Sequence, residues 1–137
     1  MSDLVRTLAV SAAGMEAQSK RLRHVAENIA NADTPGYRRK TIEFMAQRGM
    51  ADMAPTGSVQ PGSVRTGPVR LDQRPLPLIH DPGHAMADET GHYQGSNVDL
   101  VVEIADAREA QRSYEANLRL FDQTRQMSAS LIELLRR

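Results

Sequence analysis

The chain has 137 residues, of which 40% are hydrophobic and only 4% are aromatic. Lysine plus arginine and aspartate plus glutamate number 17 each, so no net charge favours binding to nucleic acid or to an anionic membrane. The absence of cysteine excludes disulfide bonds, thiol catalysis and thiolate metal sites. This length suits one domain. The scarcity of aromatic side chains predicts an interior of aliphatic residues, as in packed helices.

The first residues carry charged Asp3 and Arg6 and contain no apolar stretch long enough for a secretory leader. No apolar run approaches the roughly 18 residues that a membrane-spanning helix needs. We therefore expect neither a cleaved signal peptide nor a membrane span, and export would require another route.

A long amphipathic helix is predicted for residues 4–32. Apolar residues recur there with the alternating four- and three-residue spacing of a coiled-coil seam, which Ser11 and Gln18 interrupt. Gly14 costs about 1 kcal/mol of helix propensity relative to alanine, which indicates a backbone packed closely on it or a mild bend. A stripe this narrow needs a partner helix. The stripe consists of Leu4, Leu8, Met15, Leu22, Val25, Ile29 and Ala32.

This helix is expected to stop at the run Thr34–Tyr37, which reads Thr-Pro-Gly-Tyr. The residue before a proline is pushed out of the helical region, and Pro-Gly is a turn dipeptide. Nearby Asn28, Asn31 and Asp33 have short polar side chains that can bond the free backbone groups of the helix end. Taken alone, the run is an ordinary helix terminus.

Residues 41–96 hold six of the seven prolines and seven of the nine glycines, and they predict a small β insert with long loops. Alternation predicts a short strand at 41–44. Residues 47–67 are expected to form an extended or mobile loop. Residues 68–79 allow edge strands at best because of their prolines. Residues 85–93 are expected to form a small hairpin.

The helical period returns near residue 97 and predicts a second helix over 98–135. Asn97 is the expected N-cap, and Asp99 in the first turn suits the helix dipole. The apolar stripe of this helix again has coiled-coil spacing and then drifts towards the C-terminus. It consists of Leu100, Ile104, Ala107, Gln111, Tyr114, Leu118 and Phe121, followed by Met127, Leu131, Leu134 and Leu135.

The predicted fold is therefore mainly α, with two long terminal helices that form an antiparallel coiled-coil pair. The helices lie in residues 1–34 and 97–137, and a Gly/Pro-rich loop with a small β-hairpin insert occupies residues 35–96, all within one structural unit. A two-helix hairpin with few large side chains is marginal alone. Its remaining apolar surface predicts further copies or partners.

Basic residues within 20–24 and at Arg38–Lys40 allow two interpretations. They could form a phosphate-binding arm, or they could be solvated residues that compensate the helix dipole. No groove-reading module surrounds them, and only Tyr37 is an aromatic residue interleaved with them. We favour the second interpretation and expect no nucleic-acid partner.

An enzyme or a metal protein is the other alternative. His80 and His84 flank Asp81, with His92 nearby, but Pro82-Gly83 between the histidines prevents the helical presentation of two ligands. The sequence also lacks a phosphate-binding glycine loop and a Gly-x-Ser-x-Gly elbow. We expect no catalytic residue, no cofactor and no metal site.

Two segments at opposite ends of the chain resemble a pair of known signatures. Met-Glu-Ala-Gln at 15–18 and the run from Ala26 through Thr34–Tyr37 resemble the N-terminal signature of the bacterial flagellar axial proteins of the rod, hook and hook-filament junction. Residues 95–117 resemble the C-terminal signature of these proteins.

Within this family, the short chain and Asp81-Pro82-Gly83-His84 are most similar to a proximal rod protein, although the turn at 33–37 is shorter than in many members. The resemblance implies a structural subunit of the flagellar basal body that transmits torque from the inner-membrane ring to the hook. It also implies export through the flagellar type III apparatus and a place in the periplasmic rod. The implied partners are other rod proteins, the membrane ring and further copies of the chain.

A component of a related type III secretion needle or translocon remains the alternative, because it shares the order helix, insert, helix. The residues expected at subunit interfaces lie on both stripes, at the helix stop and in the second signature. They are Leu4, Leu8, Met15, Leu22, Val25, Asn28, Ile29, Asn31, Thr34, Pro35, Gly36, Tyr37, Asn97, Leu100, Ile104, Gln111, Tyr114, Asn117, Leu118, Phe121 and Leu131.

Overall fold

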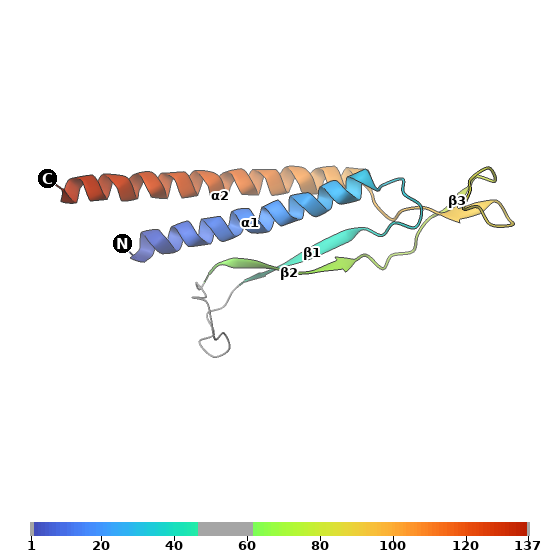
Figure 1. The fold of residues 1–137 in the computed structure, drawn as a ribbon, viewed down its shortest axis with the longest axis horizontal. Coiled ribbons are helices and arrows are strands. Elements are labelled where there is room, and N and C mark those ends of the chain that lie inside the picture. The colour runs from blue at the N-terminus through green and yellow to red at the C-terminus, as the bar shows by residue number, and fades with distance from the viewer. Residues whose placement is uncertain (1, 47–61, 137) are drawn as a thin grey trace, which may run out of the picture. The chain divides into compact units, whose positions relative to one another are not determined.

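The computed structural model describes residues 2–46 and 62–136 and contains two long helices with short strands between them (Figure 1). The prediction of two terminal helices around a small β hairpin is confirmed. The elements in chain order are α1 (Ser2–Ala30), β1 (Lys40–Ala46), β2 (Val64–Leu71), β3 (Leu78–His80), β4 (His92–Gln94) and α2 (Leu100–Leu135).

The chain divides into two compact units, and both helices contribute to each. The first unit comprises Met1–Lys20, Glu43–Gly67 and Ala110–Arg137, and the second comprises Arg21–Ile42 and Pro68–Glu109. The expectation of a single structural unit stays a prediction.

The described strands form two separate two-stranded sheets, β1 with β2 and β3 with β4. In the second sheet the strands run antiparallel, with Ile79 opposite Tyr93 and His80 opposite His92. Pro68 lies inside β2, where it is tolerated because each strand of a two-stranded sheet is an edge strand.

The hairpin prediction for residues 85–93 is wrong in its first arm. The partner of β4 is β3, and residues 85–87 lie in the turns that connect these two strands. The turn chemistry at Asp88 explains the difference. Its carboxylate Oδ1 accepts hydrogen bonds from the Thr90 amide at 2.8 Å and from the His92 amide at 3.0 Å, which folds the chain locally before β4 begins.

The predicted loop at 47–67 is also wrong at its end, because Val64–Gly67 belong to β2. These residues have a pairing partner in β1, which extends to Ala46. Residues 47–61 lie outside the described part of the chain.

Helix α1 ends at Ala30, two residues before the predicted position, and the predicted stop follows it. The Tyr37 amide donates to the Thr34 carbonyl at 3.2 Å and closes a turn around Gly36, whose φ of 74° suits glycine. The Asn31 side chain donates to the Glu27 carbonyl at 2.8 Å, and this carbonyl also accepts the Asn31 amide at 3.1 Å, so the contact reinforces the last turn instead of satisfying a free carbonyl.

Helix α2 begins at Leu100, and its N-cap is Asp99, which corrects the assignment of this role to Asn97. The Asp99 carboxylate accepts the Val101 amide at 2.9 Å, whereas Asn97 Oδ1 accepts the Arg39 amide at 2.7 Å. The side chain of Asn97 is therefore used in a contact outside the helix.

Small and polar residues form the buried positions of the first unit. Ser11, Ala17, Ala110 and Thr124 are at most 4% exposed. The Ser11 and Thr124 hydroxyls donate to carbonyls of their own helices, at 2.7 Å and 2.8 Å. The larger apolar residues of this unit, among them Leu8, Met15 and Phe121, are only partly buried.

Gly14 has the close neighbour that was expected, but this neighbour is the side chain of Asn117 and not a backbone segment. A Cβ added to Gly14 would lie 2.8 Å from Oδ1 of Asn117 in α2.

The buried positions Glu103, Ala110 and Thr124, with half-buried Asn117 between the last two, recur every seven residues along α2. The predicted stripe at Ile104, Gln111 and Leu118 is offset from them by one residue, about 100° around the helix. Ala107, Tyr114 and Phe121 of the same predicted stripe are of intermediate exposure and follow the buried positions at helical spacing. As an intrachain contact line, the stripe is therefore wrong only at Ile104, Gln111 and Leu118.

We predict that Gly14→Ala lowers the thermal unfolding midpoint of the chain, followed by far-ultraviolet circular dichroism. Alanine favours the helix by about 1 kcal/mol, but its Cβ requires the Asn117 side chain to move. In an Asn117→Ala background the same change should raise the midpoint, because the space is then open. Equal effects of Gly14→Ala in both backgrounds would contradict the close contact.

Candidate functional site

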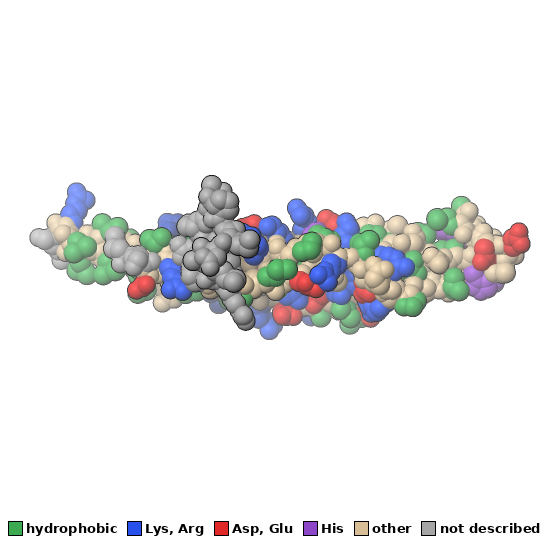
Figure 2. Space-filling model, turned by 90° about the horizontal axis from the view of Figure 1, so that it is seen from below, with side chains coloured by type: hydrophobic (Ala, Val, Ile, Leu, Met, Phe, Trp, Pro, Cys, Tyr) green, Lys and Arg blue, Asp and Glu red, His purple; other side chains and the backbone are tan. Residues whose placement is uncertain are grey.

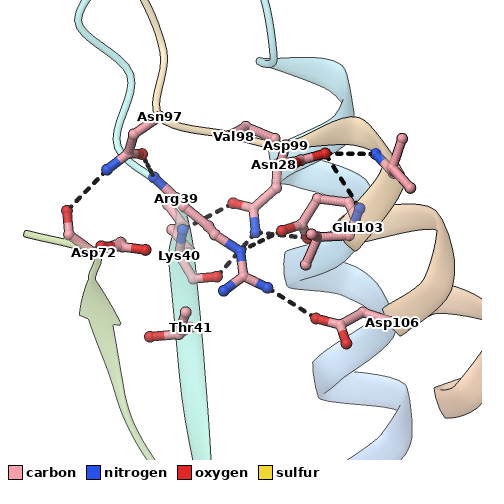
Figure 3. A network of polar contacts seen from close by, with 12 residues as sticks. Asn28, Arg39, Lys40, Thr41, Asp72, Asn97, Val98, Asp99, Glu103 and Asp106 are labelled. Carbon is pink, nitrogen blue, oxygen red and sulfur yellow. Dashed lines mark hydrogen bonds and ion pairs between the residues drawn. The ribbon is translucent and has the colours of Figure 1, made fainter. Parts of the chain in front are cut away.

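Asn28 of α1 is the centre of a buried polar cluster in the second unit (Figure 3). Its Oδ1 accepts the Lys40 amide at 2.9 Å and the Tyr37 hydroxyl at 3.0 Å. Its Nδ2 donates to the Lys40 carbonyl at 2.9 Å and to Glu103 Oε2 at 3.1 Å. The Asn28 amide therefore uses its full hydrogen-bonding capacity, with two bonds accepted by Oδ1 and two donated by Nδ2. The end of α1 is therefore tied to the first residue of β1.

Tyr37 supplies its hydroxyl to this cluster from the turn after α1. Burial raises the pKa of the Tyr37 phenol above its ordinary value. The phenol therefore remains protonated at neutral pH and can donate to Asn28.

Glu103 of α2 is fully buried, and its carboxylate has two partners from distant parts of the chain. Besides the Asn28 amide, it accepts Nε–H of Arg39 (Figure 3). A buried carboxylate requires such partners, because leaving it without them costs far more than leaving a neutral group unpaired. We call Asn28, Arg39 and Glu103 the polar node.

Arg39 precedes β1 and joins a second carboxylate of α2. Its Nη2 donates to Asp106 Oδ2 at 2.8 Å, while Arg21 of α1 donates to Asp106 Oδ1 at 3.0 Å. Burial by itself lowers the pKa of Arg39, but the hydrogen bond and charge of Glu103 outweigh it, so the pKa lies above its ordinary value.

Asn97 and Arg38 attach the segment after β2 to the same region. Nδ2 of Asn97 donates to the carbonyls of Asp72 at 3.2 Å and Arg74 at 3.3 Å. The Arg38 guanidinium donates to the same two carbonyls, both at 3.1 Å. Together with the bond between Asn97 and the Arg39 amide, these contacts join the segments before β1, after β2 and before α2.

Several of the basic residues that could have formed a phosphate-binding arm pair with carboxylates of the same chain. Besides Arg21 and Arg39, Lys40 Nζ lies 2.9 Å from Glu27 Oε2. The hydrogen bond from Lys40 lowers the pKa of Glu27, and Glu27 in turn raises the pKa of Lys40, so both are charged at neutral pH. This internal pairing argues against a phosphate-binding arm. The last turn of α1 holds no basic residue, so the expected compensation of the helix dipole by these residues is wrong.

The histidines of the insert contact other rings. The His80 and His92 rings lie 4.6 Å apart, and His84 stacks on Tyr93 with 4.0 Å between ring centroids. Within residues 2–46 and 62–136, no group of three or more His, Asp or Glu side chains is arranged to hold a metal ion. Neither helix, over its described residues, is apolar enough over a sufficient length to span a membrane.

Large apolar side chains remain exposed along α2, and hydrophobic side chains also reach the surface on the face drawn in Figure 2. A shallow groove in the first unit is lined by α2 residues from Gln123 to Leu134. The exposed apolar residues of α2 are Leu100, Val101, Val102, Ile104, Leu118, Leu120, Met127, Leu131, Ile132, Leu134 and Leu135.

The residues predicted for subunit interfaces fall into three classes of exposure, and no contact with another subunit tests them. Two are buried, namely Val25 and Asn28. The exposed ones are Ile29, Thr34, Gly36, Leu100, Ile104, Gln111, Leu118 and Leu131. Those of intermediate exposure are Leu4, Leu8, Met15, Leu22, Asn31, Pro35, Tyr37, Asn97, Tyr114, Asn117 and Phe121.

The structure brings Asn28, Tyr37 and Asn97 together inside the chain. Sequence reasoning missed Arg39 and Glu103 as their partners. One signal was available, because Glu103 is the single charged residue in the apolar segment 100–104.

Comparison with known proteins gives matches at both ends and over nearly the whole chain. The family model "Flagella basal body rod protein" matches residues 8–38, and "Flagellar basal body rod FlgEFG protein C-terminal" matches residues 89–134. These two ranges include the polar node except for Arg39, which directly follows the first.

Relatives named "Flagellar basal-body rod protein FlgC" align almost from end to end. The protein of Agrobacterium fabrum is 40% identical, and the alignment covers 99% of this chain and 98% of the relative. The protein of Salmonella typhimurium is 32% identical, and the alignment covers 96% of this chain and 97% of the relative. That of Aquifex aeolicus is 34% identical, covering 93% of each. The chain thus belongs to the FlgC family of flagellar basal-body rod proteins.

Proposed function

We propose that the chain is a structural subunit of the proximal flagellar rod and assembles through its terminal helices into the shaft that transmits torque to the hook. The observation that carries this proposal is the exposure of large apolar side chains along α2 in a chain similar to rod proteins over its full length. Neither matched family model describes an enzyme. The proposed role is mechanical, without catalysis or a cofactor.

We further propose that α1 and α2 pair antiparallel. Within the second unit, Arg21 contacts Asp106 and Asn28 contacts Glu103. Residue numbers rise along α1 as they fall along α2, as antiparallel helices require. A regular coiled-coil seam between them would have to accommodate the small and polar residues at the buried positions.

The exposed apolar side chains of α2 are the surface that neighbouring subunits would cover. Leu118 and Leu131 are 40% and 44% exposed, and both lie on the stripe proposed for subunit contact. Contiguous apolar surface of this kind marks protein interaction sites. Neighbours would include further copies, other rod proteins and the membrane ring. Delivery to the periplasm would follow the type III route without a cleaved signal peptide.

We predict that Leu118→Asp abolishes motility in a complementation assay and prevents incorporation into basal bodies. Because Leu118 is already 40% exposed, the change should alter the stability of the isolated chain by less than about 1 kcal/mol. In an interface it would bury an unpaired charge, at a cost of several kcal/mol per subunit contact.

The control is Gln73→Asp, which adds the same charge at an exposed position outside both helices. It should retain motility. Normal motility of the Leu118→Asp strain, with the variant present in purified basal bodies, would contradict the proposed contact face.

We also predict that the terminal helices of the isolated monomer are incompletely protected from amide hydrogen exchange. Only three hydrophobic side chains in the described part of the chain are buried, and helices of this kind gain most of their stability from packing. Exchange at low protein concentration, followed by mass spectrometry, measures this directly. Full protection along both helices of the monomer would contradict a surface completed by neighbours.

A further inference from the structure

The first turn and a half of α2 has its polarity reversed relative to an ordinary surface helix. Glu103 is fully buried, whereas the four apolar residues around it, Leu100, Val101, Val102 and Ile104, are 44–77% exposed. A helix would ordinarily turn its apolar residues inward and its charge to solvent. The interactions of Glu103 must therefore determine how this part of α2 is oriented.

The partners of Glu103 come from two different segments. Asn28 belongs to α1, and Arg39 lies directly before β1. In the described part of the chain, Arg39 is the one cation that pairs with Glu103. If α2 docked on α1 while β1 was detached, the carboxylate would be buried with the Asn28 amide alone, which is strongly unfavourable for a charge.

The hydrogen bonds of Asn28 also require β1 to be docked when α1 and α2 pair. Its amide bonds both backbone groups of Lys40, the first residue of β1, as well as Glu103. Detaching β1 would leave buried donors and acceptors of Asn28 without partners. Each of the three segments thus satisfies polar groups that the other two bury.

We propose that the polar node is a latch that makes docking of the start of α2 on the end of α1 conditional on docking of β1. The latch holds Glu103 inward and so turns the apolar residues of 100–104 outward. The contacts between α1 and α2 and the contacts of β1 with both helices then form and break together, in one cooperative step. This inference concerns folding of the single chain and stands whether or not the proposed assembly is correct.

The test is hydrogen exchange on the purified full-length chain, resolved to residues 21–30, 40–44 and 100–109. In Arg39→Gln, the buried Glu103 carboxyl loses its cationic partner. Protection should fall about a hundredfold in all three segments together, which corresponds to the roughly 3 kcal/mol cost of breaking a buried pair. A loss confined to 40–44 would overturn the latch, because the segments would then open independently.

The double variant Arg39→Gln/Glu103→Gln keeps the inference falsifiable if Arg39→Gln simply unfolds. Removing both charges leaves two neutral amides that can bond each other and Asn28, so protection should recover at least about tenfold relative to Arg39→Gln. A double variant that is less protected than Arg39→Gln would show that the two side chains contribute additively, and it would overturn the proposal.

Arg74→Gln is the matched control, because Arg74 pairs with Asp72 while remaining 60% exposed in the same unit. An exposed pair contributes little, so protection in the three segments should change less than about fivefold. A loss equal to that of Arg39→Gln would show that any change of arginine in this unit has the same effect, and the latch would be refuted.

Discussion

The buried carboxylate of Glu103 is the constraint on which the second unit depends. It lies on α2, and its partners belong to the end of α1 and to the residue before β1. A charge without water is stable only when its hydrogen-bond partners are in place. The end of α1, the start of α2 and the residue before β1 therefore meet at this carboxylate.

This polar interior has a consequence for the surface of the chain. Where other helical proteins bury mainly leucine and isoleucine, the described part of this chain buries mostly polar residues and alanine, with Val25 as the largest buried aliphatic side chain, and leaves most of the large apolar residues of α2 exposed. The proposed low stability of the monomer and the proposed association with neighbouring subunits would have the same origin in this arrangement.

Local patterns predicted the two helices, but neither the strand pairing nor the orientation of the start of α2. Apolar periodicity predicted both helices, and Pro35-Gly36 predicted the turn after α1. At the start of α2 the buried position is Glu103 and not the predicted Ile104, because the Glu103 carboxylate pairs with Arg39, 64 residues away along the chain. Asn97 was taken for an N-cap for the same reason, since its distant partner Arg39 is invisible to a local rule. Asp88 illustrates a different limit, because a side-chain turn replaced the expected strand at 85–87.

A reconstruction of an assembled rod at side-chain resolution is the most direct measurement of the central claim. The account predicts that Glu103 is paired with Asn28 and Arg39 of its own chain, while Leu118 and Leu131 lie against neighbouring subunits. The account would be contradicted if Glu103 paired with a residue of another subunit, or if Leu118 and Leu131 packed against α1 of the same chain.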